Sequence, residues 1–199
     1  MKKDYIPEGA ERRFYSSPLE VRKAEDKEYF RGTAVVFNSP TNLGWYTEEI
    51  RDGAFDEAMD EDVRALFNHD PDVILGRNKS GTLTLTADKT GVHYEVEYNS
   101  NDPDHVRVME KVKRGDVSQS SFAFTVADDE WSKRDGADFR TITKIRRWFD
   151  VSPVTYPAYQ DTTVAARSLE KIKTETQHMV DDEEEREQYL RNYYELIVK

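Results

Sequence analysis

The 199-residue chain lacks cysteine altogether. This absence excludes disulfides, thiol catalysis and cysteine-bound zinc, and it fits a reducing compartment. The chain also lacks any apolar run near the ~20 residues that a membrane-spanning helix needs, and no signal-peptide pattern follows Met1. We therefore expect no membrane partner.

Basic side chains are scarce relative to acidic ones. The chain has 29 Lys and Arg against 40 Asp and Glu, which gives a formal net charge of −11. A general nucleic-acid binder needs a basic surface that displaces counterions from phosphates, so no nucleic-acid partner is expected. The apolar fraction of 37% is also low for a single globule, which predicts that part of the chain is solvated.

Breaks in composition divide the chain into three expected parts. These are an N-terminal arm over 1–28, a main domain over 29–163 and a C-terminal tail over 164–199. The arm contains a Ser16-Ser17-Pro18 break, and it is either a weakly ordered leader or an added edge strand. The tail has a helical period that is interrupted by acid from Asp181 to Glu187, which predicts a helical, acidic appendage.

Most of the main domain has the composition of β-strands. Residues 82–98 give the clearest local pattern, because apolar and polar residues alternate on both sides of a glycine-bearing turn, as in a β-hairpin. The other expected elements are strands over 29–37, 45–50, 63–67, 117–126 and 139–156, a short helix over 54–59 and a polar loop over 128–138.

Residues 102–115 have the pattern of a capped helix. Asp102 suits the N-cap and Gly115 suits the C-terminal cap, while Val106, Met109 and Val112 predict a buried stripe. The order of strands, helix and strands predicts a small mixed barrel or sandwich with helices packed outside.

One of the four histidines lies in a context that suggests chemistry. His69 follows the apolar strand expected over 63–67, and loops at strand ends are where a rigid scaffold presents reactive groups. The others, His93, His105 and His178, lie on a polar hairpin face, in a first helical turn and in the tail. We expect no chemistry from these three.

Serine is the nucleophile class with a suggestive context. Ser118, Ser120 and Ser121 lie on a strand that enters the core, although serine is also common on the polar side of a strand. Serine catalysis needs an imidazole beside the hydroxyl and a third group that orients the imidazole. Any pairing of His69 with these serines must arise from tertiary structure, because they are far apart in the sequence.

A metal site is an alternative use of the same loop. His69, Asp70 and Asp72 are possible ligands, because imidazole and carboxylate groups both bind divalent metals. Their spacing matches no established metal-site pattern, however, and Asp-Pro-Asp is also ordinary turn composition. We expect no bound metal or cofactor.

Five stretches in the main domain match one known family in their order. They are Arg31 to Asn38, Glu48 to Phe55, Ala65 to Pro71 with Leu75-Gly76-Arg77, Arg114 to Phe124, and Asp150 to Tyr159. The chain in this region resembles the prohead maturation proteases of tailed phages, which are related to the herpesvirus assemblin proteases. The resemblance spans residues 31–160, and five pieces in order are far more specific than any one of them.

The resemblance implies a serine protease whose nucleophile follows its histidine in the chain. The family's histidine falls on His69, and its serine falls on Ser121. Ala123 stands where the family usually has glycine in a Ser-Phe-Gly-Phe context, which leaves the oxyanion donors undefined. Ser118 and Ser120 are alternative nucleophiles close by.

A carboxylate would complete the site. In the herpesvirus relatives the third member comes from a strand after the serine, and Asp150 fits that order. Glu95 and Glu97, on the polar face of the expected hairpin, remain alternatives.

The resemblance also implies a fold and a biological setting. We expect an α+β fold, a small and mostly antiparallel β-barrel with surrounding helices and a helical C-terminal tail. The expected function is a serine endopeptidase that matures proheads by cleaving scaffolding segments of the major capsid protein and itself. It would act inside the immature capsid in the host cytoplasm, and it is a possible homo-oligomer. The alternative is a non-enzymatic assembly factor with the same fold.

Overall fold

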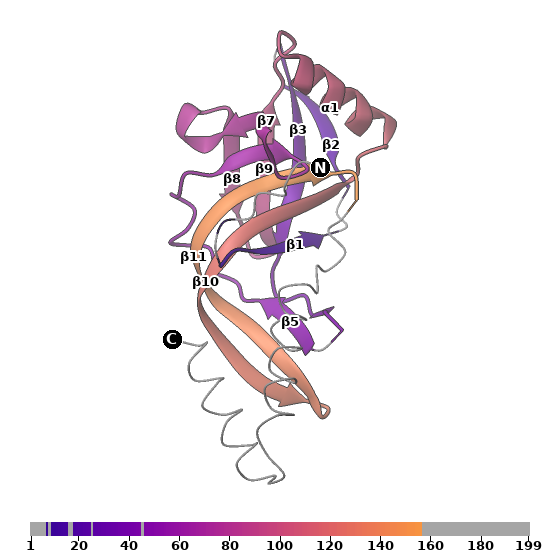
Figure 1. Ribbon diagram of the computed structural model, residues 1–199. Coiled ribbons are helices and arrows are strands. Elements are labelled where there is room, and N and C mark those ends of the chain that lie inside the picture. The colour runs from indigo at the N-terminus through magenta and orange to yellow at the C-terminus, as the bar shows by residue number, and fades with distance from the viewer. Residues whose placement is uncertain (1–6, 8, 16–17, 25, 45, 157–199) are drawn as a thin grey trace. The chain divides into compact units, whose positions relative to one another are not determined.

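The computed structural model, which describes residues 7, 9–15, 18–24, 26–44 and 46–156, contains two β-sheets and one α-helix (Figure 1). The tail over 164–199 lies outside these described residues. Among them, no helix is long and apolar enough to cross a membrane.

The first sheet has seven strands in the order β1-β10-β11-β5-β4, and β6 joins it by pairing with both β11 and β7. Their bounds are β1 (Glu11–Tyr15), β4 (Thr41–Asn42), β5 (Tyr46–Ile50), β6 (Arg64–Phe67), β7 (Asp70–Arg77), β10 (Gln119–Arg134) and β11 (Ala137–Val154).

The second sheet has four strands in the order β2-β3-β9-β8. The strands are β2 (Glu20–Ala24), β3 (Lys27–Val36), β8 (Leu83–Ala87) and β9 (Gly91–Glu97). A short 3₁₀ turn, η1 (Asn78–Ser80), precedes β8, and the helix α1 (Pro103–Arg114) follows β9. The antiparallel pair β8–β9 is the hairpin that the alternating residues of 82–98 predicted.

The prediction of a closed barrel with surrounding helices is wrong. The path through the first sheet ends at β1 and β4, and the second sheet ends at β2 and β8, so the described strands form two open sheets. Local alternation of apolar and polar residues places side chains on faces, but it does not determine whether edge strands join. The described part of the chain is therefore mostly β, with α1 as its one α-helix.

The short helix expected over 54–59 is a series of turns. Ala54, Phe55 and Ala58 are buried, so the apolar spacing that suggested a helix belongs to a loop packed on the core. Gly53, with φ +84, redirects the chain just before this segment. The bond from the Met59 N–H to the Phe55 carbonyl is one helical turn that does not continue.

The caps predicted for α1 are confirmed, but its buried stripe differs from the expected one. The Asp102 side chain accepts a hydrogen bond from the Asp104 N–H, and Gly115 has φ +80. The buried residues are His105, Val108, Met109 and Val112, whereas Val106 is exposed. Steps of three and four residues follow the 3.6-residue period, and the expected steps of three alone drift away from the buried face.

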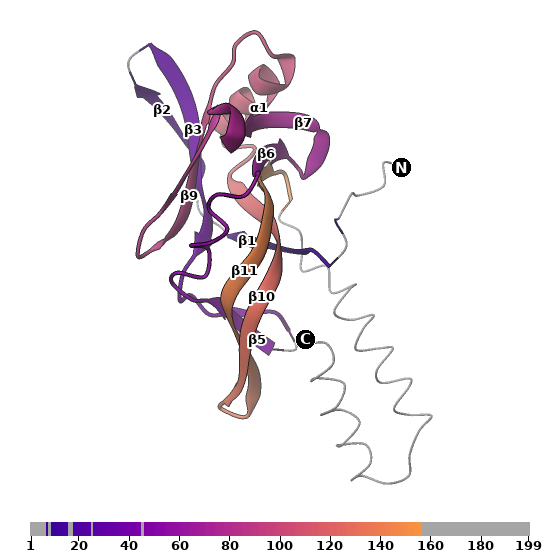
Figure 2. The same ribbon diagram turned by 90° about the vertical axis from the view of Figure 1, so that its left-hand side faces the viewer.

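The polar loop expected over 128–138 is instead the far part of a long hairpin. β10 and β11 pair antiparallel as far as Arg134 and Ala137, and Asp135 and Gly136 form the turn with φ +52 and +79. An Asp-Gly pair with positive φ is a favoured two-residue hairpin turn. Figure 1 and Figure 2 show this tip at the opposite end from α1. Residues 130–138 are all exposed, and they are polar or charged apart from Trp131, Gly136 and Ala137.

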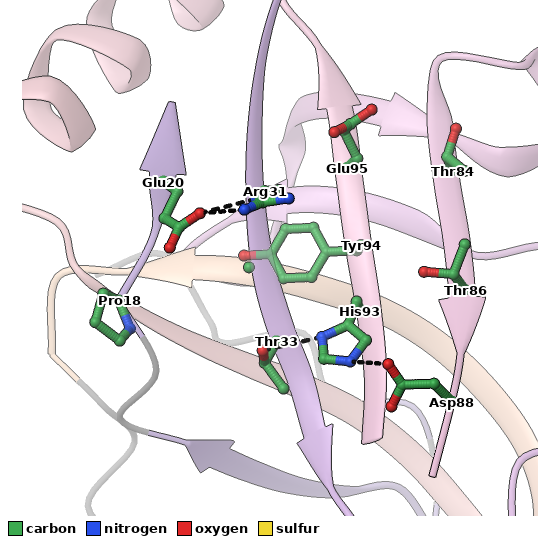
Figure 3. A pocket seen from close by; sticks show the side chains of 11 residues that line it. Pro18, Glu20, Arg31, Thr33, Thr84, Thr86, Asp88, His93, Tyr94 and Glu95 are labelled. Atoms are coloured by element: carbon green, nitrogen blue, oxygen red, sulfur yellow. Dashed lines mark hydrogen bonds and ion pairs between the residues drawn. The ribbon is translucent and has the colours of Figure 1, made fainter. Parts of the chain in front are cut away.

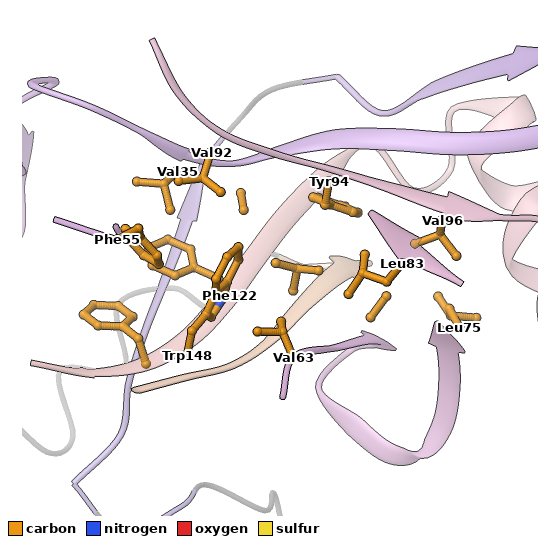
Figure 4. Packing of buried hydrophobic residues seen from close by; sticks show 14 of the residues in the cluster. Val35, Phe55, Val63, Leu75, Leu83, Val92, Tyr94, Val96, Phe122 and Trp148 are labelled. Carbon is orange, nitrogen blue, oxygen red and sulfur yellow. The ribbon is translucent and has the colours of Figure 1, made fainter. Parts of the chain in front are cut away.

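An aromatic cluster fixes the central strands of the first sheet. The Phe55 ring meets the Trp148 ring edge-on with centroids 5.0 Å apart, and it lies 6.0 Å from the Phe122 ring (Figure 4). Val35 and Val92 of the second sheet complete this part of the core. Such packing holds β10 and β11 in one register, so the polar side chains on their other face are held as well.

Candidate active site

A β-bulge turns one carboxylate of β11 away from the aromatic core. Asp150 pairs with Ala123, while Trp148 pairs with Phe124, so Phe149 is an extra residue on β11. One extra residue changes the alternation of side chains. Asp150 therefore faces the same side as Ser121, although Trp148, two residues earlier, lies in the core.

His69 lies in a two-residue turn between β6 and β7. Asn68 and His69 both have φ +56, the left-handed region that a type I′ hairpin turn requires at both central positions. The turn is tied to β11, because the Asn68 N–H donates to the Pro153 carbonyl at 3.0 Å and the Thr155 N–H donates to Asn68 Oδ1 at 2.9 Å. The left-handed conformation of a non-glycine residue is thus held by neighbouring backbone.

Three buried side chains form one hydrogen-bonded chain. His69 Nε2 lies 2.7 Å from Ser121 Oγ, and His69 Nδ1 lies 2.6 Å from Asp150 Oδ1. The exposed fractions of His69, Ser121 and Asp150 are 7%, 0% and 6%. A neutral imidazole that donates its Nδ1–H to the carboxylate leaves Nε2 free to accept the serine proton. This is the relation between nucleophile, base and orienting acid that serine catalysis requires.

The alternative serines and carboxylates from the sequence lie elsewhere. Ser120 Oγ is hydrogen-bonded to the Tyr94 hydroxyl at 2.8 Å, and Ser118 is exposed. Glu95 accepts hydrogen bonds from Arg22, and Glu97 accepts one from Lys27, both at the second sheet.

The metal alternative finds no support in the described residues, where no group of three or more metal-ligating side chains is arranged to hold an ion. His69 is turned toward Ser121 and Asp150, while Asp70 Oδ1 accepts from the Asp72 N–H in a local turn. His105 also has a structural contact, because its Nδ1 accepts the Asn99 N–H and burial lowers its pKa.

Ser152 is a site residue that the sequence analysis missed. Its Oγ donates to Asp150 Oδ1 at 2.8 Å and accepts the His69 backbone N–H at 3.3 Å. Ser152 also pairs directly with Ser121 across the β10–β11 ladder. A usable signal was present, because Asp150 and Ser152 are polar residues two apart in a strand end that is otherwise apolar.

β1 lies along the edge of β10 beside the nucleophile. Phe14 pairs with Ser121, and Arg13 pairs with Phe122. Ser121 Oγ lies within hydrogen-bond distance, 3.0 Å, of the Arg13 carbonyl oxygen. This edge strand belongs to the arm for which the sequence left two possibilities open, and the contact of its backbone with Ser121 was not foreseen.

A charged cluster lies behind β1 and contains three acids and two bases. Arg13 binds Glu48 of β5, and Arg140 of β11 binds Glu11, Glu48 and Asp129. Burial alone would raise the pKa of Glu11, but the Arg13 and Arg140 guanidinium groups lower that pKa to about 2. Glu11 therefore stays ionised at neutral pH.

A separate hollow of about 470 Å³ lies on the second sheet (Figure 3). Its lining is mostly polar and includes Glu20, Arg31 and His93, and the Ser121–His69–Asp150 chain is not part of it. Ion pairing of Arg31 with Glu20 already satisfies two of these groups. The hollow therefore lies apart from the candidate active site.

A buried Ser–His–Asp arrangement of this kind is the one that serine hydrolases use. The sequence pattern of the caudovirus prohead serine proteases matches residues 17–176, and the chain belongs to this family of serine peptidases. Comparison with curated proteins and with solved structures found no match. The resemblance to phage prohead proteases is thus confirmed, while the relation to the herpesvirus proteases stays a prediction. Membership implies a capsid protein as substrate and action within the phage capsid in the host.

Proposed function

We propose that Ser121 is the nucleophile, His69 the general base and acid, and Asp150 the orienting carboxylate of a capsid maturation protease. The observation that carries this proposal is the continuous hydrogen-bonded chain from Ser121 Oγ through the imidazole to Asp150 Oδ1. Each member is held by a different element, β10, the β6–β7 turn and β11. Such convergence of three polar groups in a buried place is typical of a catalytic site.

The proposed reaction proceeds in two steps. Ser121 Oγ bonds to the carbonyl carbon of the peptide while His69 Nε2 takes the hydroxyl proton, and the same proton passes to the amine as the C–N bond breaks. Water then bonds to the acyl carbon, gives a proton to Nε2, and the bond to Ser121 breaks as Oγ regains that proton. One water and one peptide bond become a carboxylic acid and an amine.

The substrates that we propose are scaffolding segments of the major capsid protein and the protease itself, cleaved inside the immature capsid in the host cytoplasm. The test is to incubate purified protein with the capsid protein precursor of its own phage, with and without a covalent serine-directed inhibitor. Inhibitor-sensitive fragments are expected. Intact precursor in both samples would instead favour a non-enzymatic assembly factor.

Asp150→Asn is expected to lower turnover by on the order of 10⁴. An amide at this position can donate to Nδ1, which places the ring proton on Nε2 and removes the acceptor for the Ser121 proton. The measurement is the rate of precursor cleavage. Asp138→Asn, at the exposed start of β11, is the matched control and should keep the full rate. Equal rates for the two variants would remove Asp150 from the site.

The tail is proposed to be a docking appendage that is separate from catalysis. A chain ending at Thr163 should still fold and cleave, because the buried core cluster lies within residues 30–151. Its incorporation into the shell should weaken. Thermal melting, precursor cleavage and packaging would be compared with a chain ending at Thr176, where the family match ends. If the chain ending at Thr163 unfolds while the chain ending at Thr176 stays folded, the tail is part of the domain.

A further inference from the structure

The backbone of β1 occupies the place where a substrate backbone is needed. β1 is extended and antiparallel to β10, and it is an edge strand of the sheet. The Arg13 carbonyl carbon lies within about 4.2 Å of Ser121 Oγ, since the oxygen is 3.0 Å away and a C=O bond is about 1.23 Å long. Peptides commonly bind by adding a strand to a sheet edge.

The contact with β1 also concerns the serine proton. Ser121 has one hydroxyl hydrogen and two acceptors within reach, His69 Nε2 at 2.7 Å and the Arg13 carbonyl at 3.0 Å. Only one of them can take this hydrogen in a linear bond. While β1 lies on β10, it both covers the nucleophile and competes with the base.

The Arg13 side chain enters an acidic site on β5. Glu48 accepts from Arg13 Nε at 2.6 Å and from Nη2 at 2.9 Å, which is a two-point contact between guanidinium and carboxylate. Glu48 is only 3% exposed. A buried carboxylate that binds the side chain of the residue beside the nucleophile would distinguish basic from neutral residues.

The neighbouring base provides a second contact, for an acid two residues earlier in the strand. Arg140 donates to both carboxylate oxygens of Glu11, at 2.8 and 3.1 Å. Without β1, the cluster retains Glu48, Asp129 and Arg140. The formal charges of Glu11 and Arg13 cancel, so an incoming strand that brings one acid and one arginine would restore the same ion pairs without changing the net charge of the cluster. The two contacts together suit the pattern acid–any residue–arginine.

We propose that substrates bind as an added strand on the β10 edge, with an arginine held by Glu48 immediately before the scissile bond, and that β1 is an internal stand-in for this strand. Arg140 binds an acidic side chain two residues before the arginine. Glu48 and Arg140 are thus specificity-determining residues. This inference rests on the proposed function, because it assumes that Ser121 attacks the carbonyl beside it.

The first test uses a synthetic peptide with the sequence of residues 8–18 and the full-length protein. Mass spectrometry should find cleavage between Arg13 and Phe14 of the peptide. A peptide with glutamine in place of Arg13 should be cleaved about 10- to 100-fold more slowly, as expected for loss of a hydrogen-bonded charge pair. Equal cleavage of the two peptides, or cuts after neutral residues only, would overturn the inference.

The second test assigns the preference to Glu48. In Glu48→Gln protein the ratio of the two peptide cleavage rates should fall to near 1, and this ratio cancels any general loss of activity. Glu49→Gln is the matched control, because Glu49 binds Arg134 and Thr141, and it should keep the full ratio. A ratio that survives in Glu48→Gln would contradict the assignment.

The third test asks whether β1 occupies the place where the substrate strand would bind. Arg13→Ala in the protein removes the side chain that anchors β1 to Glu48, so cleavage of the peptide in trans should become about 10-fold faster or more. Slower cleavage would show that β1 only supports the sheet.

Failure of this inference and failure of the proposed function give different results. Ser121-dependent cleavage of the capsid precursor at positions without a basic residue would overturn the specificity and leave the catalytic proposal intact. Absence of any Ser121-dependent cleavage, of precursor or peptide, would overturn both.

Discussion

Ser121→Ala is expected to abolish precursor cleavage, with a loss on the order of 10⁶ in turnover. The substitution removes the atom that bonds to the carbonyl carbon, and neither water nor His69 replaces a positioned alkoxide. It deletes a single hydroxyl from a small, fully buried strand residue, so the fold should remain. Cleavage rate and thermal melting of the same sample separate chemistry from stability.

The neighbouring serines provide the controls for this experiment. Ser118→Ala should change neither the cleavage rate nor the melting temperature, because Ser118 is exposed. Ser120→Ala should keep the activity but lower the free energy of unfolding by about 1–3 kcal/mol, since the buried Tyr94 hydroxyl loses its hydrogen-bond partner. Activity that survives in Ser121→Ala and disappears in Ser118→Ala would place the nucleophile elsewhere on β10.

His69→Ala is expected to lower turnover by a similar factor, on the order of 10⁶, because nucleophile and base act as one unit. Without the imidazole, Ser121 keeps its proton, and no group returns a proton to the leaving amine. A serine-directed fluorophosphonate should therefore label Ser121 in the unsubstituted protein and fail to label it in the variant. The two readouts use different reactions of the same hydroxyl.

Histidines outside the hydrogen-bonded chain serve as comparisons. His93→Ala should retain cleavage and labelling, because His93 contacts Thr33 and Asp88 on the second sheet. His105→Ala should lower the melting temperature, since His105 is buried in α1, and it should leave labelling of the folded fraction intact. Labelling of Ser121 that persists in His69→Ala would contradict the serine–histidine mechanism.

The local elements of this fold were predictable where a few neighbouring residues determine the structure. Alternation around the Asp88–Gly91 turn identified the hairpin, and Asp102 and Gly115 identified the ends of α1, because caps and turns depend on the backbone next to them. The failures were long-range. Whether sheets close, and whether a polar stretch such as 128–138 extends a hairpin, depends on strands distant in the sequence.

The candidate site was likewise predictable only in part. Resemblance to a family pointed to His69 and Ser121, but the choice between Asp150 and the two glutamates remained open, because chain order does not say which carboxylate faces the imidazole. The bulge at Phe149 turns Asp150 toward it, and no sequence pattern marked this bulge. Glu48 of β5 likewise acquires its partner only because the folded sheet brings the Arg13 side chain of β1 to it across β10 and β11.

The short connection between β1 and β2 has a consequence for when the protease acts. Only residues 16–19 separate the two strands, and a segment on so short a linker competes for its site at an effective concentration on the order of millimolar. On the proposal that β1 stands in for substrate, free capsid protein in a dilute solution is too sparse to displace it. On the same proposal, displacement of β1 requires competing strands at a comparable local concentration, as a shell built from the substrate would provide. Enclosure itself would then switch the enzyme on, with no separate activator.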